Sequence, residues 1–221
     1  DVPAGTSGSE AEILATKMEE AINKPAWNNL RWVSWTFPGD KVYVWDKYRQ
    51  FLLIEWGGKR VIMNLKNKEG KAWQENQAVS GNTAAKFIKT AWEGFCNDSF
   101  WFIAPTKAFD KGVKREMVIM PSGEKALKVI YQDGGVTPGD TYLWEFDQKT
   151  NLPTSFKMWV KIIPIGGIKS TWENWITLPG GAKIAIDRKL GPLNIKMSNV
   201  MSGKSYKDCG LEKDPFLSLS K

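Results

Sequence analysis

Residues 30–65 read LRWVSWTFPGDKVYVWDKYRQFLLIEWGGKRVIMNL, and this stretch decides the fold. The segment from Leu30 to Phe37 has a period of two, which is the spacing of a β-strand. Three further runs rich in β-branched and aromatic residues follow at 42–45, 51–56 and 61–65. The segments between these runs are as short as hairpin turns. The stretch therefore predicts an antiparallel meander.

The strand pattern continues along the chain with two helical interruptions. Ser9 and Glu12 have the spacing of a capping box, so we expect a helix to begin there and to end before Pro25. Asn82 can cap a second helix, which is expected to end near residues 96–98. The apolar stretch 99–105 is bounded by turn formers and is expected to form a buried loop or lid. Further strands are expected at 71–74, 115–120, 126–131, 141–146, 154–163, 168–176, 182–187 and 193–200.

About a dozen strands at this spacing predict a mainly β (α+β) fold. We expect one strongly curved antiparallel sheet or unclosed β-barrel, with the two main helices covering its concave face. No composition break or linker divides the chain, so residues 9–221 are expected to form a single domain. Residues 1–8 are small and polar, and a flexible N-terminal tether is expected there.

The net charge of the chain, and how the basic residues are distributed, indicate whether it binds nucleic acid. The chain of 221 residues has 31 Lys and Arg against 24 Asp and Glu, a formal charge of +7. The basic residues occur singly or in pairs and form no run, so we expect no binding of nucleic acid. No stretch approaches the ~20 apolar residues of a spanning helix, and Asp1 follows no signal region.

The residue types that carry most enzyme chemistry are scarce. The chain has no His, and motifs for a nucleophilic serine or a phosphate-binding loop do not occur. Cys96 and Cys209 are too far apart in sequence for a redox or zinc pair, and either a disulfide or two thiols fits the sequence. Two carboxylates such as Glu55 and Glu173 could in principle form a glycosidase pair, but the sequence does not give the distance between them. We therefore expect no enzyme, no catalytic residues, no cofactor and no metal.

The aromatic residues point to binding instead. The chain has 12 Trp and 10 Phe, more rigid aromatic surface than a core of this size needs. Alternation places Trp144 on the same strand face as Tyr142, and Trp172 on the same face as Ser170. Bulky apolar groups with a few polar ones suit a ligand cavity, although the same residues would also form a core under two helices.

A carbohydrate-binding β-sandwich module is the alternative, because Trp stacks on the apolar faces of sugars. Such a module needs several exposed Trp on one face. Trp172 and Trp175 are expected on opposite strand faces unless a bulge intervenes, which weighs against this reading.

The order of these elements, with the terminal segment from Leu211 to Phe216, resembles the bacterial LolA/LolB-like superfamily of periplasmic lipoprotein carriers. The similarity of layout spans nearly the whole chain. Residues 95–101 and 137–140 also look like segments of uncharacterised exported proteins of Bacteroidetes-type bacteria. The resemblance implies an unclosed half-barrel with a concave apolar cavity, a helical lid and an envelope location.

We therefore expect a non-enzymatic protein of the bacterial periplasm or outer membrane that binds a lipid, an acyl chain or another apolar small molecule. Contact with a membrane surface fits this role. Lys and Arg at the rim of the concave cavity would steer the anionic head group of a ligand. The sequence leaves the oligomeric state open. The expected ligand-lining residues are Trp35, Trp101, Phe102, Trp144, Met158 and Trp172.

Overall fold

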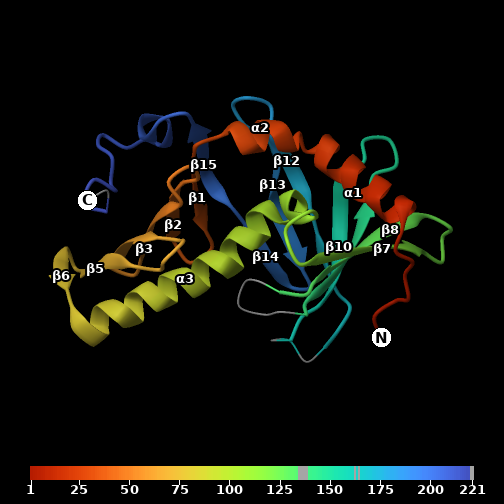
Figure 1. The fold of residues 1–221 in the computed structure, drawn as a ribbon, viewed down its shortest axis with the longest axis horizontal. Coiled ribbons are helices and arrows are strands. Elements are labelled where there is room, and N and C mark those ends of the chain that lie inside the picture. Colours follow the sequence, from red (N-terminus) through yellow and green to blue (C-terminus); the bar gives the residue numbers. More distant parts are fainter. Residues whose placement is uncertain (134–138, 162, 164, 220–221) are drawn as a thin grey trace. The chain divides into compact units, whose positions relative to one another are not determined.

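A computed structural model describes residues 1–133, 139–161, 163 and 165–219 (Figure 1). The mainly β class and the unclosed antiparallel arrangement are confirmed, because the described strands form two open sheets of seven and eight strands and no closed barrel. By their contacts, residues group into two compact units. Unit 1 comprises Asp1–Trp27, Phe102–Thr177 and Gly181–Ile195, and unit 2 comprises Asn28–Trp101, Leu178–Gly180 and Lys196–Lys221. The predicted single domain is not tested by this grouping.

The eight-stranded sheet belongs to unit 1. Along its main path the order is β12-β13-β11-β10-β9-β8-β7, and β14 pairs with β13. The helix α1 (Ser9–Ala21) packs on β7 and β8. The strands are β7 (Val113–Ile119), β8 (Lys125–Tyr131), β9 (Thr141–Phe146), β10 (Pro153–Trp159), β11 (Ile168–Thr171), β12 (Glu173–Thr177), β13 (Lys183–Leu190) and β14 (Leu193–Lys196).

The start of α1 is predicted correctly, but its capping is not. The N-cap is Gly8, and no side chain caps the helix. Glu12, the expected partner of Ser9, instead accepts a hydrogen bond from Arg115 Nε on β7 at 2.9 Å. A tertiary ion pair thus replaces the capping box. The small side chains of Ala11 and Ala15 are fully buried and bring α1 close to its neighbours.

The N-terminal residues before α1 contact the same sheet. Thr6 forms an antiparallel backbone bridge with Met117 on β7. Lys128 on β8 donates to the carbonyl oxygen of Pro3 at 2.8 Å. The flexibility expected of residues 1–8 stays a prediction.

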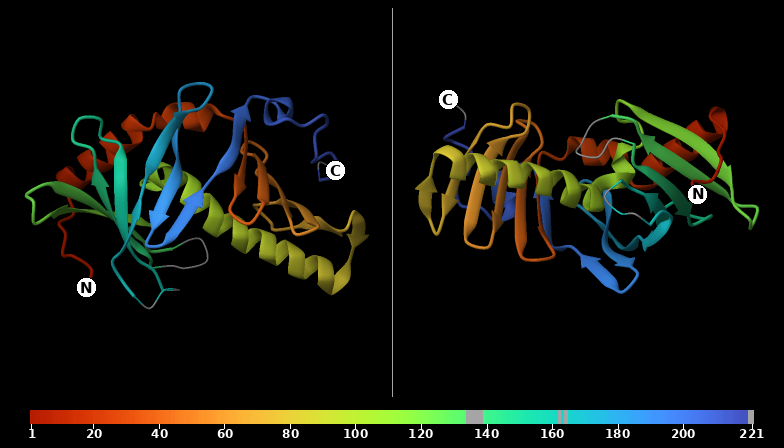
Figure 2. Two further views of the ribbon diagram at one scale, coloured as in Figure 1. Left: turned by 180° about the vertical axis from the view of Figure 1, so that it is seen from behind. Right: turned by 90° about the horizontal axis from the view of Figure 1, so that it is seen from below.

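The seven-stranded sheet belongs to unit 2, in the order β15-β1-β2-β3-β4-β5-β6. One face packs Trp32, Phe51 and Phe216 into a buried cluster, with the rings of Trp32 and Phe216 stacked at 5.6 Å. Figure 2 shows α3 (Gly81–Ile103) running along this sheet, and Phe95 of α3 packs against Trp45. The strands are β1 (Trp32–Phe37), β2 (Lys41–Asp46), β3 (Phe51–Trp56), β4 (Lys59–Asn64), β5 (Gly70–Gln74), β6 (Gln77–Val79) and β15 (Ser198–Gly203).

Three shorter helical elements complete the described secondary structure: α2 (Lys24–Asn29), η1 (Ala104–Lys107) and η2 (Tyr206–Cys209). Pro25 lies in the first turn of α2, where the missing backbone N–H of proline costs no hydrogen bond. The predicted end of the first helix before Pro25 is confirmed, since α1 ends at Ala21.

The expectation of a loop or lid at 99–105 is wrong. α3 continues to Ile103, and the 3₁₀ helix η1 follows directly. Asp98 lies at the expected end of the helix, but its carboxylate accepts hydrogen bonds from Tyr43 Oη at 2.6 Å and from Lys41 Nζ at 3.0 Å. These partners satisfy the side chain, so it does not compete with the helical backbone.

Two predicted strands are each split into two. The stretch 168–176 forms β11 and β12 with a break at Trp172, and 193–200 forms β14 and the start of β15 with a break at Met197. Asn174 has a φ of 54°, which interrupts the regular strand twist beside Trp172. These breaks, together with β6, raise the described strands to fifteen from the dozen expected.

Candidate functional site

One face of the unit 1 sheet carries a row of packed aromatic rings. The register between β9 and β10 places Trp144 opposite Phe156 and Tyr142 opposite Met158. The ring of Phe156 lies 5.0 Å from Trp144 and 5.1 Å from Tyr142 between centroids, in edge-to-face arrangements. All four side chains are buried. The face is therefore apolar and well ordered.

Trp172 extends this row across β11. Its ring centroid lies 5.0 Å from that of Trp144 and 6.4 Å from that of Trp175. The register pairs Trp175 with Ala185 on β13, one residue out of phase with Ile184, so the closeness of the two rings does not contradict the expectation that they lie on opposite strand faces. Trp172 is only 2% exposed, so the two rings do not form an open platform for a sugar.

A buried arginine lies against this row. Arg188 on β13 is fully buried, and its guanidinium carbon lies 3.4 Å from the ring centroid of Trp172. Its Nη1 donates to the carbonyl oxygen of Asp187 at 2.8 Å, and its Nη2 donates to that of Ala185 at 3.0 Å. Burial lowers the pKa of Arg188 to about 9, against the opposing effect of Asp187. A cation in this position is costly to bury and is stabilised by the indole face.

Sequence reasoning missed Arg188, although one signal was available. Ile184, Ile186 and Arg188 alternate along β13, so the arginine is in phase with two apolar residues. Period-two alternation therefore directs it to the same sheet face as those isoleucines.

The indole N–H of Trp172 is a further polar group on this face. The indole Nε1 of Trp172 is buried, and within the described parts of the chain it has no hydrogen-bond acceptor. Leaving a buried donor unsatisfied costs about 1–3 kcal/mol. The aromatic face thus carries two neighbouring donor groups, the guanidinium and this N–H.

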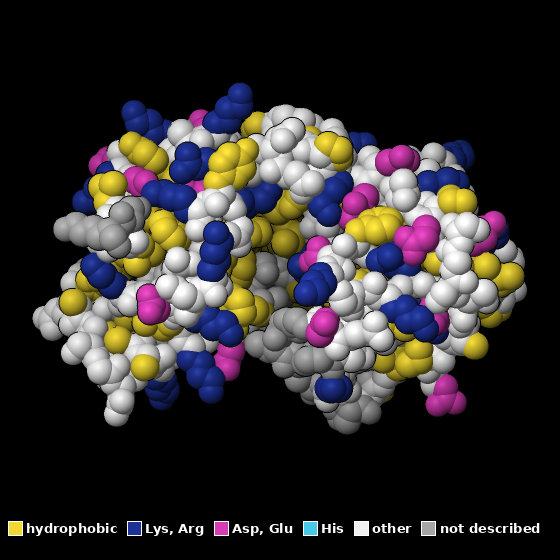
Figure 3. Space-filling view, in the orientation of Figure 1, with side chains coloured by type: hydrophobic (Ala, Val, Ile, Leu, Met, Phe, Trp, Pro, Cys, Tyr) yellow, Lys and Arg dark blue, Asp and Glu magenta, His cyan; other side chains and the backbone are white. Residues whose placement is uncertain are grey.

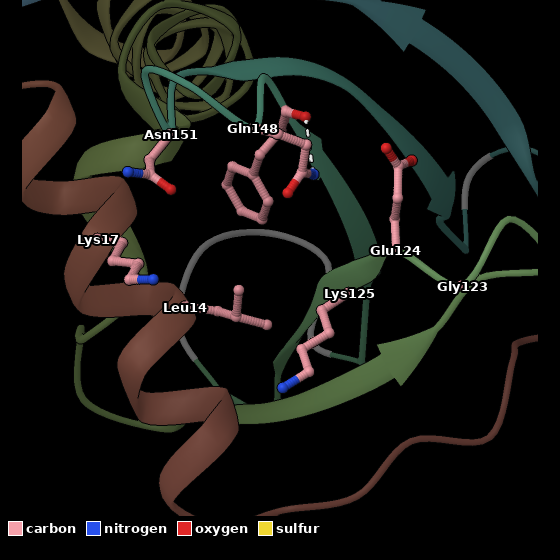
Figure 4. A pocket seen from close by; sticks show the side chains of 8 residues that line it. Leu14, Lys17, Gly123, Glu124, Lys125, Gln148 and Asn151 are labelled. Carbon is pink, nitrogen blue, oxygen red and sulfur yellow. Dashed lines mark hydrogen bonds between the residues drawn. The ribbon is translucent and has the colours of Figure 1, made fainter.

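A hollow of about 360 Å³ lies between α1 and the ends of two hairpins of unit 1. In Figure 4, Leu14 and Lys17 come from α1, and Glu124 and Lys125 lie across the hollow from them. Its volume is at the lower end of small-molecule sites, which span about 300–1,000 Å³. The lining residues are Leu14, Lys17, Gly123, Glu124, Lys125, Phe146, Gln148 and Asn151.

Phe146 connects the hollow to the aromatic row. It lies on β9 at two and four residues from Trp144 and Tyr142, so all three side chains share one sheet face. Leu14 is the other large apolar group of the lining, and the remaining members are polar or small. Lys125 Nζ donates to Glu10 Oε2 on α1 at 2.7 Å. The hollow therefore has an apolar floor and a charged rim.

The six predicted ligand-lining residues divide between the units. Trp144, Met158 and Trp172 share the aromatic face of unit 1. Phe102 also belongs to unit 1 and packs edge-to-face against Trp27 at 6.4 Å. Trp35 lies in unit 2, stacked on Tyr43 at 4.8 Å, and Trp101 lies on α3 in unit 2. The ligand-lining role of all six stays a prediction.

The described residues offer little support for a metal site or a reactive thiol. Within the described ranges, no group of three His, Cys, Asp or Glu is placed to hold a metal ion. Burial raises the pKa of the Cys209 thiol to about 11, which disfavours the reactive thiolate. Figure 3 shows Lys and Arg scattered over the visible face, with Asp and Glu among them. Among the described helices, none is both long and apolar enough to span a membrane.

No protein-family model matches the sequence, and a search of curated proteins finds no match. The solved structures that match this chain include the following two. A DUF1329 family protein from Desulfovibrio piger has 11% sequence identity and a TM-score of 0.40, with 86% of this chain and 91% of that chain covered. A putative outer membrane lipoprotein-sorting protein domain from Vibrio parahaemolyticus has 10% identity and a TM-score of 0.37, with 93% of this chain and 98% of that chain covered.

Proposed function

We propose that this chain is a non-enzymatic binding protein that takes up an acyl chain or similar apolar group on the aromatic face of unit 1. One observation carries the proposal: the hollow beside α1 and the buried aromatic row share a sheet face through Phe146. An apolar group that enters at Leu14 would meet Phe146 and then Trp144.

The free energy gained by burying methylene groups is large enough for this site to bind an apolar ligand. Burial of ten methylenes would contribute roughly 8 kcal/mol before ordering costs are subtracted. That is the free energy of about micromolar binding, so the polar rim does not have to supply most of the affinity. The rim would orient the ligand instead.

Uptake requires the contacts between α1 and the sheet to loosen, because the aromatic rings pack directly on one another. Two ion pairs tie α1 to the sheet, between Glu10 and Lys125 and between Glu12 and Arg115. Each pair includes an exposed carboxylate, so each contributes little to stability and breaks at a small cost. In this proposal α1 acts as the lid that the layout implies.

Native mass spectrometry of the purified protein with dodecanoate and dodecanol tests this proposal. We expect a one-to-one complex, and we expect Leu14→Trp to abolish it by filling the hollow. Ile13→Trp is the matched control, because Ile13 is the preceding residue of α1 and is 48% exposed. Equal binding by wild type and both variants would place the ligand elsewhere, and no complex with either amphiphile would reject the function.

The cellular setting is part of the proposal. An exported protein of the periplasm or outer membrane, in contact with a membrane surface, has access to acyl chains. Cell fractionation with an antibody against the chain tests this location, and recovery in the cytosolic fraction would contradict it.

A further inference from the structure

The rim of the hollow beside α1 carries charges of both signs. Lys17 on α1 and Lys125 on β8 are cations, and Glu124, which immediately precedes β8, is a carboxylate. Glu10 on α1 adds a second carboxylate, because it accepts the hydrogen bond of Lys125 Nζ at 2.7 Å. These two cations and two carboxylates carry no net charge together. The rim therefore does not select for a simple anion, although the whole chain has a formal charge of +7.

Two of these four groups are already paired with each other. The hydrogen bond from Lys125 lowers the pKa of Glu10, and the nearby charge of Lys17 has a smaller effect in the same direction. Among the described residues, Lys17 makes no direct ion pair, and neither does Glu124, whose carboxylate accepts a hydrogen bond from Ser122 Oγ at 3.2 Å. Both side chains are exposed. One cation and one carboxylate are thus open to a ligand.

The placement of these two groups sets the shape of the ligand. Figure 4 shows Lys17 on α1 and Glu124 on the opposite side of the hollow. The side-chain amides of Gln148 and Asn151 line the same hollow and can both donate and accept hydrogen bonds. The floor between the charged groups is apolar. A ligand that joins both sides therefore has an oxyanion facing Lys17, an ammonium facing Glu124 and an apolar part on the floor.

We infer that Lys17 and Glu124 form a head-group subsite for a zwitterionic amphiphile, with its oxyanion on Lys17 and its ammonium on Glu124. This inference rests on the proposed function and names its ligand class. The head group lies outermost, and the acyl chain points towards Phe146. A purely anionic head group would meet the carboxylate of Glu124 as a like charge, which is unfavourable.

Equilibrium dialysis with two monomeric lysophospholipids tests the subsite. Dodecanoyl lysophosphatidylethanolamine and dodecanoyl lysophosphatidylglycerol share the acyl chain and the phosphate, but only the first has an ammonium. We expect the wild type to bind the first roughly fivefold more tightly, which is the gain from about one exposed ion pair. Glu124→Gln should bring the ratio of the two affinities close to one, and Glu124→Lys should reverse the preference. Lys17→Met should weaken both lysophospholipids about equally, because both carry the phosphate.

Matched controls change the same charges away from the hollow. Glu69→Gln removes an exposed carboxylate of unit 2, and Lys149→Met removes an exposed cation next to Gln148 that does not line the hollow. Both controls should keep the wild-type affinities and their ratio. All four positions, Lys17, Glu69, Glu124 and Lys149, are exposed, so these variants are expected to fold like the wild type.

The outcomes separate the two proposals. Equal binding of both lysophospholipids by the wild type, a preference that survives Glu124→Gln, or unchanged affinities in Lys17→Met would overturn the subsite and leave apolar binding intact. Binding of neither lysophospholipid, nor of dodecanoate or dodecanol, would overturn both proposals. Phosphoethanolamine without an acyl chain should not compete at equal concentration. Competition as strong as that of the lysophospholipid would show a small zwitterion as the ligand and would overturn the inference.

Discussion

Asp46 shows how a single side chain organises unit 2. Its carboxylate is fully buried and accepts hydrogen bonds from Arg31 Nη2 at 3.0 Å and from Arg49 Nε at 2.6 Å. Arg49 also pairs with Asp214 near the C-terminus at 2.8 Å. Burial alone would raise the pKa of Asp46, but the hydrogen bonds from Arg31 and Arg49 outweigh it and lower the pKa. One carboxylate thus links β2 to the C-terminal segment.

Asp46→Asn should destabilise unit 2 by about 2–3 kcal/mol, since hydrogen bonds to a charged group are lost and Arg31 and Arg49 each lose the Asp46 carboxylate as a partner. The pKa of Asp46 is depressed in the folded state, so its stabilising effect is present above the ordinary value of 3.8 and is lost as the pH falls through the folded value. Urea unfolding as a function of pH checks this. As the pH falls, the free energy of unfolding of Asp46→Asn should decrease less than that of the wild type, because the variant has no carboxylate to protonate at this position. The same pH dependence in both proteins would contradict the stabilising role of the Asp46 carboxylate.

Phe216 anchors the C-terminal segment, with its ring stacked on Trp32 and fully buried. Phe216→Ala should cost about 3–5 kcal/mol, because a large side chain leaves a well-packed cluster. Leu217→Ala is the control, since Leu217 is 66% exposed and should change the free energy of unfolding by less than about 0.5 kcal/mol. A loss in Phe216→Ala as small as that in Leu217→Ala would show that the segment does not stabilise unit 2.

At the scale of elements, α3 is held on the unit 2 sheet by a polar contact inside an aromatic cluster. The Tyr43 hydroxyl donates to Asp98 at 2.6 Å, and the rings of Trp35 and Phe95 pack around Tyr43. Burial, and then the nearby Asp98 carboxylate, raise the pKa of Tyr43. The hydroxyl therefore stays protonated and remains a donor.

Tyr43→Phe should lower the free energy of unfolding by about 1.5–3 kcal/mol, because it removes a hydrogen bond to a buried carboxylate. Tyr48→Phe is the matched control, since the Tyr48 hydroxyl is exposed and should contribute within about 0.5 kcal/mol. Chemical unfolding followed by circular dichroism compares the two. A neutral Tyr43→Phe would mean that Lys41 and Asn97, which also donate to Asp98, satisfy the carboxylate without the hydroxyl.

The same elements show what local pattern can and cannot predict. The bounds of β3 and β9 agree with the predicted strands at 51–56 and 141–146, because turn residues flank clear β-forming runs. The C-terminal turns of α3 were missed because Tyr43, the partner of Asp98, is 55 residues away in sequence. The break beside Trp172 was not predicted, because no local signal in the sequence marks which Asn adopts a positive φ, as Asn174 does.

At the scale of the whole molecule, the sequence pattern predicted one open, curved antiparallel sheet or unclosed barrel with helices, but not the division of the strands between two sheets or the grouping into two units. Of the six residues expected around a ligand, Trp144, Met158 and Trp172 share one face, because cross-strand register is set by short hairpins. Trp35 packs in the other unit, where its strand lies in a different sheet. The period-two alternation of apolar residues predicts a strand, but it does not determine which sheet the strand joins.

Photolabelling tests the central claim most directly, because it reports where an acyl chain lies. A dodecanoate analogue with a diazirine on its chain would be irradiated with the protein, and the labelled peptides mapped by mass spectrometry. The account predicts labels on β9, β10 and Trp172 of unit 1, all displaced by excess dodecanoate. Labels confined to unit 2, or labels that excess dodecanoate does not displace, would contradict it.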